Sequence, residues 1–486
     1  MIRRITLLIL LLTLAEPAQA GPLIGLLTGA AGFTGAITIA GIATTSLGFR
    51  LLATVALSAI SRALQPKPKL QMPQGIRTQY PTAGGVTPQT FMLGYYASEG
   101  NRICPDYTFG SAGGTPNAYL VKIRDFGDVP GMSLGRVMIN KQFVTLAAVA
   151  HPDYGFPVLD FREGTTDYAW VKYYDGSQIA ADPFMLAQFG ADPDYPWSAD
   201  MVGTGICYAI FTFRYNRERF SDDPSLRCEF TGIPLYDPRK DTTVGGAGTH
   251  RWGTLATYQT TTNPQIMKYN ILRGITLPDG SIWGGEAAAP DVPLSVWFAA
   301  MNECDVVANG ETAPQFQAGL EISVDQEPAD IIDELDKTCL GQTFEAGGVW
   351  KTRSGAPGLP VYFFTDDDVI ITEEQELDPF PGLESTYNGL QATFPDPNSL
   401  WNPKEAPPRY NPIWEAQDQG RRLIANIQYN AAPYSDQVQR LMVASVNEER
   451  RFRRHTLVLP PDAAILEPLR CRQLDQRAKW VHLQVV

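Results

Sequence analysis

The chain has 486 residues, of which 44% are hydrophobic and 19% are charged. This composition excludes an intrinsically disordered chain, because it supplies enough apolar residues for two to four compact domains. The net charge of −13 is unevenly divided, since residues 1–98 carry a net +6 and the remaining residues therefore carry −19. Phosphate binding needs a basic surface, so we predict that the acidic body makes no sequence-specific nucleic-acid contacts.

The cysteines indicate the kind of chemistry that the chain does not carry. Its six cysteines lie far apart without a CxxC pair, and only four histidines accompany them. Such spacing indicates neither a zinc site nor a dense disulfide framework. We therefore predict ordinary buried thiols, with no metal site and no cofactor. The cysteines are Cys104, Cys207, Cys228, Cys304, Cys339 and Cys471.

The N-terminus has the pattern of a secretory signal peptide. Arg3 and Arg4 precede an apolar run at residues 5–14, and residues 18–20 end the stretch with small side chains. The apolar run is too short to span a bilayer as a helix. Cleavage of residues 1–20 would leave Gly21 as the first residue.

Residues 21–64 continue the apolar character of the chain opening. Arg50 and Arg62 are the charged residues among them, and the spacing of Gly, Ala and Thr is typical of helices that pack closely in membranes. We expect an apolar helical segment that contacts a membrane or lines a pore, or alternatively a helical hairpin buried in an assembly. Residues 65–75 form a proline-rich, cationic linker.

From residue 76 onward the pattern is that of short strands and turns. Alternating apolar residues within 75–100, 119–146, 168–178 and 205–216 predict strands, with turns at Gly127-Asp128 and Asn140-Lys141. We predict a β-rich α+β fold with several small β-barrel or sheet domains and a few short helices. The predicted helices are residues 263–274, 293–305, 328–339 and 435–454. The predicted domains are residues 1–64, 65–75, 76–240, 241–390 and 391–486.

Three motifs follow one another in the middle of the chain. "FTGIPLYDPR" (230–239) precedes the predicted helix "NPQIMKYNILRG" (263–274), and a later helix at 328–339 leads into the hairpin "EAGGVWKTRSG" (345–355). This order resembles the central hub proteins of long, non-contractile phage tails, a family that includes the phage lambda tip attachment protein and the hub of gene transfer agents. The resemblance covers roughly residues 70–468. The matching residues are Gly232, Tyr236, Asp237, Pro238, Arg239, Asn263, Pro264, Tyr269, Leu272, Arg273, Gly274, Gly347, Gly348, Trp350 and Gly355.

The resemblance implies a structural rather than an enzymatic role. Proteins of this family form trimers whose β-domains make a ring at the distal end of the virion tail, next to the distal tail protein, the tape measure protein and tip or fibre proteins. It implies that the chain joins the tail tube to those proteins, closes the channel and aids genome delivery, with residues 21–64 as a plug or membrane contact. It also suggests that the 345–355 hairpin supplies strands to a small barrel or sheet, with Trp350 as an apolar anchor.

The chain departs from the family at both ends. Family members commonly continue into further β-domains after the strand that corresponds to residues 455–469, whereas "LRCRQLDQRAKWVHLQVV" follows here. We therefore expect other proteins to carry the receptor-binding extensions. The secretory pattern of residues 1–20 is also unexpected for a protein that assembles in a host cytoplasm. This pattern leaves open a second class of protein, an exported bacterial envelope protein. Such a protein could be a carbohydrate-active β-rich enzyme.

Enzymatic motifs are few and poorly placed. "GMSLG" (131–135) matches the GxSxG nucleophile elbow, but the residues after Ser133 predict a strand where the elbow needs a helix. His151 and His250 stand alone beside aromatic residues, which is typical of hydrogen-bonded loops. We predict no catalytic residue.

Two charged runs allow alternative interpretations. "TDDDVIITEEQELD" (365–378) could hold a cation through Asp366–Asp368 or supply an acid/base pair, although three adjacent Asp cannot all face one ion. We favour a solvated turn from which Val369, Ile370 and Ile371 leave as a strand. The basic run at residues 448–455 is expected to end a helix against acidic neighbours or a partner subunit, with nucleic-acid contact as the less favoured alternative.

Overall fold

The computed structural model describes residues 38–39, 42–43 and 87–474, without 113–114, 217, 221–222, 309, 356–361, 366–367, 371, 373–374, 379–385, 451–453 and 467–471. The chain divides into two compact units, Met1–Gln74 and Gly75–Val486, at a point within the predicted linker. In the first unit, the described strands β1 (Thr38–Ile39) and β2 (Ile42–Ala43) pair antiparallel. These four residues are extended rather than helical, and the rest of the 1–64 segment lies outside the described residues.

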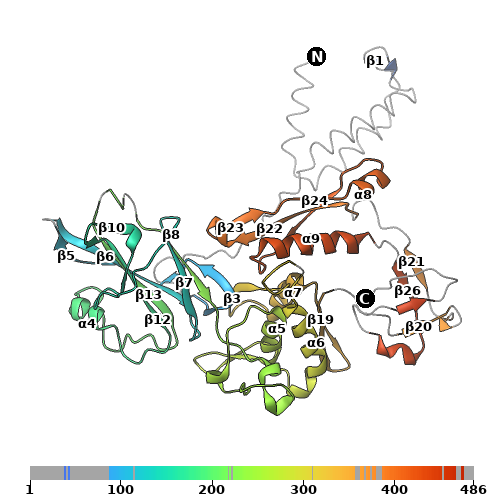
Figure 1. Cartoon of the computed structure of the whole chain (residues 1–486), viewed down its shortest axis with the longest axis horizontal. Coiled ribbons are helices and arrows are strands. Elements are labelled where there is room, and N and C mark those ends of the chain that lie inside the picture. Colours follow the sequence, from blue (N-terminus) through green and yellow to red (C-terminus); the bar gives the residue numbers. More distant parts are fainter. Residues whose placement is uncertain are drawn as a thin grey trace, which may run out of the picture. The chain divides into compact units, whose positions relative to one another are not determined.

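The second unit is β-rich, as predicted, and begins with an antiparallel sheet that we call the first sheet (Figure 1). Alternate residues of its central strand β13 face opposite sides, and both sides are buried, because Phe211 lies in one apolar core and Ile210 in another. The first sheet contains β4 (Asn101–Arg102), β5 (Tyr107–Ala112), β6 (Thr115–Gly127), β13 (Cys207–Arg214), β12 (Ala169–Asp175) and β9 (Phe156–Pro157).

A second sheet packs on the first through aromatic side chains. The Phe126 ring of β6 lies 4.8 Å from that of Phe230, measured between centroids. Asn140 and Lys141 connect two of its strands with φ of 53° and 61°, which is the tight hairpin turn predicted there. In spatial order this sheet contains β17 (Gly319–Ser323), β3 (Thr90–Ser98), β14 (Leu226–Thr231), β7 (Ser133–Ile139) and β8 (Gln142–Val144).

The four predicted helices are present, although the last ends at Glu449 and Arg454 lies in a strand, and two further short helices were not predicted. Each of these two begins with a polar residue before proline: the side chains of Asp182 and Asn411 accept hydrogen bonds from the first turns of α4 and α8. The helices are α4 (Pro183–Phe189), α5 (Pro264–Arg273), α6 (Leu294–Asp305), α7 (Pro328–Cys339), α8 (Pro412–Gln417) and α9 (Ser435–Glu449). No helix in the described part of the chain has the length and apolar character needed to cross a membrane.

A smaller sheet near the C-terminus rests on α9. Leu390 and Phe394 of its central strand pack against Leu441 and Met442 of the helix. The sheet contains β22 (Gly389–Asp396), β23 (Asn402–Glu405), β24 (Arg409–Tyr410) and β25 (Ile424–Gln428). The remaining strands form pairs: β10 (Arg162–Glu163) with β11 (Thr166–Asp167), β15 (Ile275–Thr276) with β16 (Ile282–Trp283), β20 (Tyr362–Phe364) with β27 (Arg472–Leu474), and β21 (Glu376–Asp378) with β26 (Arg454–Thr456).

One buried carboxylate ties the C-terminal sheet to the second sheet. Glu229 is fully buried and accepts two hydrogen bonds of 2.6 Å from Arg136 and one of 2.7 Å from the Trp401 indole. The Tyr95 hydroxyl donates to the same carboxylate. A buried carboxylate is tolerated only with such a full set of donors, so Trp401 is fixed against β3, β7 and β14.

The structure corrects one expectation about the hairpin. Strands β18 (Gln342–Ala346) and β19 (Val349–Arg353) pair only with each other in the described sheets, so the hairpin does not supply strands to a larger one. Its inner side chains contact helices instead. The described sheets form no closed barrel, and β17 joins a sheet whose other strands lie at residues 90–231. Four of the five described cysteines are buried free thiols, and Cys104 is half-buried.

The buried carboxyl of Asp125, in the first sheet, makes the stability of the fold depend on pH. Asp125 is 6% exposed, and burial, followed by the nearby charge of Asp128, raises its pKa to about 8. The folded chain therefore keeps a proton that the unfolded chain has released, and this group lowers the free energy of unfolding as pH rises from about 4 to 8.

We therefore expect Asp125→Asn to melt at a higher temperature than the wild type at pH 8, with the difference shrinking toward pH 4. Thermal unfolding across this pH range measures the effect. The exposed Asp200→Asn provides the matched control and should show no such trend. A stability difference for Asp125→Asn that is independent of pH would contradict this assignment.

Candidate functional site

The three sequence motifs meet at α5, which is buried along almost its entire length. The Asn263 side chain accepts hydrogen bonds from Gln265 N (3.0 Å) and Ile266 N (3.4 Å), and Gly274 ends the helix with φ of 95°. All residues from 264 to 272 are buried. Because the helix has no water-facing side over this length, its polar side chains must find partners within the protein.

Lys268 is the charged residue among these buried side chains, so its ammonium needs an acceptor for each of its protons. Its side chain is completely buried, and its ammonium donates to the Asp336 carboxylate of α7, to Thr343 Oγ1 (2.9 Å) and to Thr352 Oγ1 (3.1 Å). An ammonium has three protons, so every donor is used. The other Asp336 oxygen accepts from Thr343 N at 2.8 Å. One ion pair thus fastens α7 and both strands of the hairpin to α5.

Two amide side chains of α5 bind the backbone of the other motifs. Asn270 accepts from Tyr236 N (3.0 Å) and donates to Tyr236 O (2.8 Å). Gln265 accepts from Thr352 Oγ1 (2.9 Å) and donates to Arg353 O (3.3 Å). The first motif and the hairpin are therefore held by the same helix.

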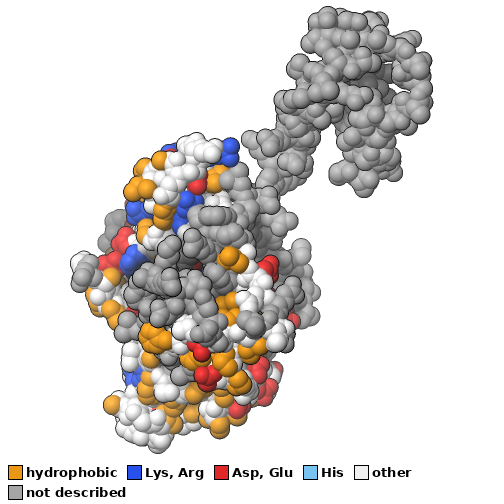
Figure 2. Space-filling view, turned by 90° about the vertical axis from the view of Figure 1, so that its right-hand side faces the viewer, with side chains coloured by type: hydrophobic (Ala, Val, Ile, Leu, Met, Phe, Trp, Pro, Cys, Tyr) orange, Lys and Arg blue, Asp and Glu red, His pale blue; other side chains and the backbone are white. Residues whose placement is uncertain are grey.

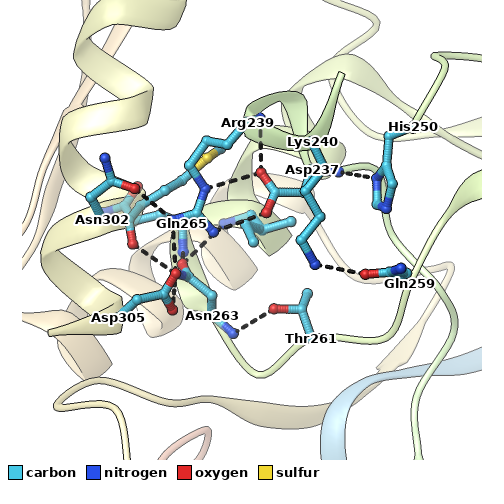
Figure 3. Close-up of polar contacts among 12 residues, drawn as sticks. Asp237, Arg239, Lys240, His250, Gln259, Thr261, Asn263, Gln265, Asn302 and Asp305 are labelled. Atoms are coloured by element: carbon cyan, nitrogen blue, oxygen red, sulfur yellow. Dashed lines mark hydrogen bonds and ion pairs between the residues drawn. The ribbon is translucent and has the colours of Figure 1, made fainter. Parts of the chain in front are cut away.

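Arg239 connects the first motif to α6 (Figure 3). Its guanidinium forms a two-pronged pair with Asp237 at 3.1 and 2.9 Å, and a further nitrogen donates to Asn302 (2.8 Å) and Asp305 (2.7 Å). Asn263, the residue that caps α5, also donates to Asp305 at 2.9 Å. This planar arrangement requires arginine, since a lysine could not bind both partners in the same geometry.

His250 completes this polar cluster from a neighbouring loop. Its side chain is 1% exposed, and Nδ1 accepts a hydrogen bond from Asp237 N at 3.0 Å. Burial, and then the charge of Lys240, lower the pKa of the imidazole. The ring is therefore held neutral as a backbone acceptor, which agrees with the loop role expected from the sequence.

The glycines of the third motif form the hairpin turn and help attach the hairpin to the helices. Gly347 and Gly348 form the hairpin tip with φ of 65° and 83°, a conformation that other residues rarely adopt. Trp350 is half-buried, and its carbonyl accepts from the Trp297 indole of α6 at 3.0 Å. Gly355, with φ of 75°, donates its N–H to Cys339 O at 2.9 Å. The hairpin is anchored on helices at both of its ends.

The arrangement holds the elements of the three motifs together. Its charged groups point at one another, and the described residues contain no group of three His, Cys, Asp or Glu that could hold a metal ion. Ser133 is exposed and opens strand β7, so no strand-to-helix elbow forms around it. His151 Nδ1 accepts from Asp153 N (3.2 Å) and Tyr154 N (3.3 Å).

The structure describes part of the acidic run at 365–378 and part of the basic run at 448–455. Asp368 is exposed and accepts from Thr365 N (2.7 Å) and Oγ1 (3.0 Å), whereas Asp366 and Asp367 lie outside the described residues. The strand expected from Val369 to Ile371 does not form at Val369 and Ile370, where the chain turns, and Ile371 lies outside the described residues. At the basic run, Arg450 follows α9 and pairs with Asp418 at 3.0 Å, as predicted.

Sequence reasoning missed Lys268 and Asp336, on which this cluster most depends, and also Glu229, which holds Trp401 against the second sheet. Two of the three carry a signal in their spacing. Lys268 lies between apolar residues of the predicted helix at 263–274, and Asp336 lies four residues after Ile332 in the predicted helix at 328–339. A charged residue within an apolar stripe indicates a buried partner, but the sequence does not name it.

Comparison with known proteins shows the fold but no family. No family model and no curated protein matches the chain. Among solved structures, it is similar to a chain in the virion of a native gene transfer agent (GTA) particle, with a TM-score of 0.56 and 13% identity over 90% of this chain and 92% of that one. A 43 kDa tail protein of prophage MuSo2 from Shewanella oneidensis also matches, with 9% identity over 80% of this chain and 85% of that one, but its TM-score of 0.26 is too low to indicate a shared fold.

The α5 ion pair gives a direct test of this description. We expect Lys268→Met to lower the free energy of unfolding by about 3–5 kcal/mol, because it leaves the Asp336 charge buried without a cation. The matched control is Lys337→Met, which removes the more exposed Lys337–Glu334 pair and should cost less than about 1 kcal/mol. Denaturant unfolding measures both, and equal losses for the two variants would contradict the central role of Lys268.

Proposed function

We propose that this chain is a structural tail hub at the distal end of a long-tailed phage or of a gene transfer agent-like particle. The observation that carries the proposal is the fold shared with a chain of the GTA virion over about nine-tenths of both chains. The contacts among the three motifs support it, because the first motif and the hairpin both bind side chains of α5, the helix of the second motif. The hub would have no catalytic activity.

The surface of the body suits assembly with proteins more than with nucleic acid. The residues after 98 carry a net −19, and on the face seen in Figure 2 the described Lys and Arg side chains form no continuous basic patch. Hydrophobic side chains are spread over the same face. We propose a homotrimer that joins the tail tube to tip or fibre proteins, with the distal tail protein and the tape measure protein as neighbours.

The composition of purified particles tests this proposal. Quantitative mass spectrometry should find three copies per particle, and a first peptide that begins at Met1 or Ile2. One or six copies would contradict the trimeric hub. Absence from particles together with a mature start at Gly21 would favour the exported envelope protein instead.

We further propose that residues 21–64 close the tail channel and contact the host membrane when it opens. Apolar segments of this size associate or enter a membrane when they are exposed to water. Three copies packed through their small residues would form a plug at the trimer axis.

Replacing Gly29 and Gly32 with Glu should therefore give particles that lose DNA early or infect poorly, because charge would enter the helix contacts. DNA retention and plating efficiency measure the outcome. Ala256→Glu, at an exposed residue of the body, is the control. Normal retention and infection by the Gly29/Gly32 variant would rule out the plug.

A further inference from the structure

Two free thiols from different helices meet in one apolar core. Cys304 lies in the last turn of α6, and Cys339 is the last residue of α7. Both side chains are fully buried, in the core that also contains Leu390 and Phe394 of the C-terminal sheet. The Cys304 thiol donates a hydrogen bond to the Cys339 sulfur, which places the two sulfurs side by side. Neighbouring sulfurs on two separate elements are the arrangement from which a disulfide can form.

The residues that follow the hairpin hold both cysteines in place. Gly355 N donates to Cys339 O at 2.9 Å. The preceding side chain, Ser354 Oγ, donates to Ala300 O at 3.0 Å, one turn before Cys304 on α6. The same hydroxyl lies within hydrogen-bond reach of the Cys304 thiol. Because two consecutive residues bind the ends of the two helices, the cysteines are kept together in the folded chain.

The two thiols differ in how readily they ionise. Gln265 Nε2 donates to the Cys339 sulfur at 3.7 Å. Burial alone would raise the pKa of the Cys339 thiol, but the hydrogen bond from Cys304 and the charge of Lys268 outweigh it and lower that pKa. Burial raises the pKa of the Cys304 thiol. Cys339 is therefore the sulfur that reacts first, since the thiolate is the nucleophilic form.

We propose that Cys304 and Cys339 form a disulfide when the protein meets hydrogen peroxide, an oxidant small and uncharged enough to suit a buried pair. The Cys339 thiolate attacks one peroxide oxygen, the O–O bond breaks, and a sulfenic acid and hydroxide result. The Cys304 sulfur then attacks the sulfenic sulfur, and the S–O bond breaks with loss of a second hydroxide. The protons of the two thiols convert both hydroxides to water. Two thiols and one peroxide thus give one disulfide and two waters.

The bond joins α6 to α7 and closes the loop of residues 304–339. A cross-link of this kind stabilises a fold mainly by restricting the unfolded chain. The pairing stands on the described residues, whereas its timing rests on the proposed function. On that function, the pair stays reduced during assembly in a reducing cytoplasm and is oxidised after the particle is released into an oxidising medium.

Peptide mapping of the full chain tests the pairing. The protein is treated with peroxide, denatured, alkylated and digested without reductant. The peptides that carry Cys304 and Cys339 should then appear as one linked species, lighter by two hydrogen atoms than the two thiol peptides together, and reductant should separate them. Free thiols at both positions after peroxide treatment, or a sulfinic acid at Cys339 without a link, would overturn the proposal.

Melting temperatures give a second test with a matched variant. We expect the oxidised wild type to melt about 5 °C above the reduced protein, and Cys339→Ala to lose this difference. Cys228→Ala removes another fully buried thiol, in a different core, and should keep the difference. If Cys339→Ala fails to fold, Cys304→Ala and the linked peptide of the wild type decide. An oxidation-dependent difference that persists in Cys339→Ala would count against the pairing.

Purified particles separate this inference from the hub proposal. The linked peptide should be present in released particles, and free thiols at both positions should be found in the chain inside the producing cells. Particles that contain the chain with free Cys304 and Cys339 thiols would refute the timing and leave the hub proposal intact. A chain that forms the disulfide but is absent from particles would refute the hub and leave the pairing intact.

Discussion

The buried ammonium of Lys268 is the constraint on which the rest of the body depends. A charge in this position is stable only if every proton has an acceptor, and the three acceptors come from α7, β18 and β19. Burial of α5 therefore requires that residues 268, 336, 343 and 352 lie together. This requirement explains why a short helix leads directly into a glycine-tipped hairpin: Asp336 and Thr343 lie on either side of the connection between them.

Internal pairing of charge also bears on function. Arg239 binds Asp237 and Asp305, and Glu229 is enclosed by Arg136, Tyr95 and Trp401. Groups that satisfy one another in this way stiffen a framework. Such a framework is compatible with the assembly role proposed above, which rests on the fold shared with a chain of a virion.

Local features of the sequence predicted local structure well. The predicted helices at 263–274 and 328–339 correspond to α5 and α7, and the predicted hairpin at 345–355 has Gly347 and Gly348 at its tip. The failures concern contacts between distant residues. Nothing near residue 319 indicates that β17 will pair with β3, more than 200 residues earlier, because strand pairing depends on the completed core. The hairpin's partner was misjudged for the same reason, since alternation shows that a strand has a buried face but not whether a sheet or a helix covers it.

Electron cryomicroscopy of the native particle that carries this chain is the most direct test of the account. The account predicts that the body, with α5 at its centre, fits density at the distal end of the tail around a three-fold axis. Density for the chain in the capsid or along the tail tube, or its absence from the particle, would contradict that role.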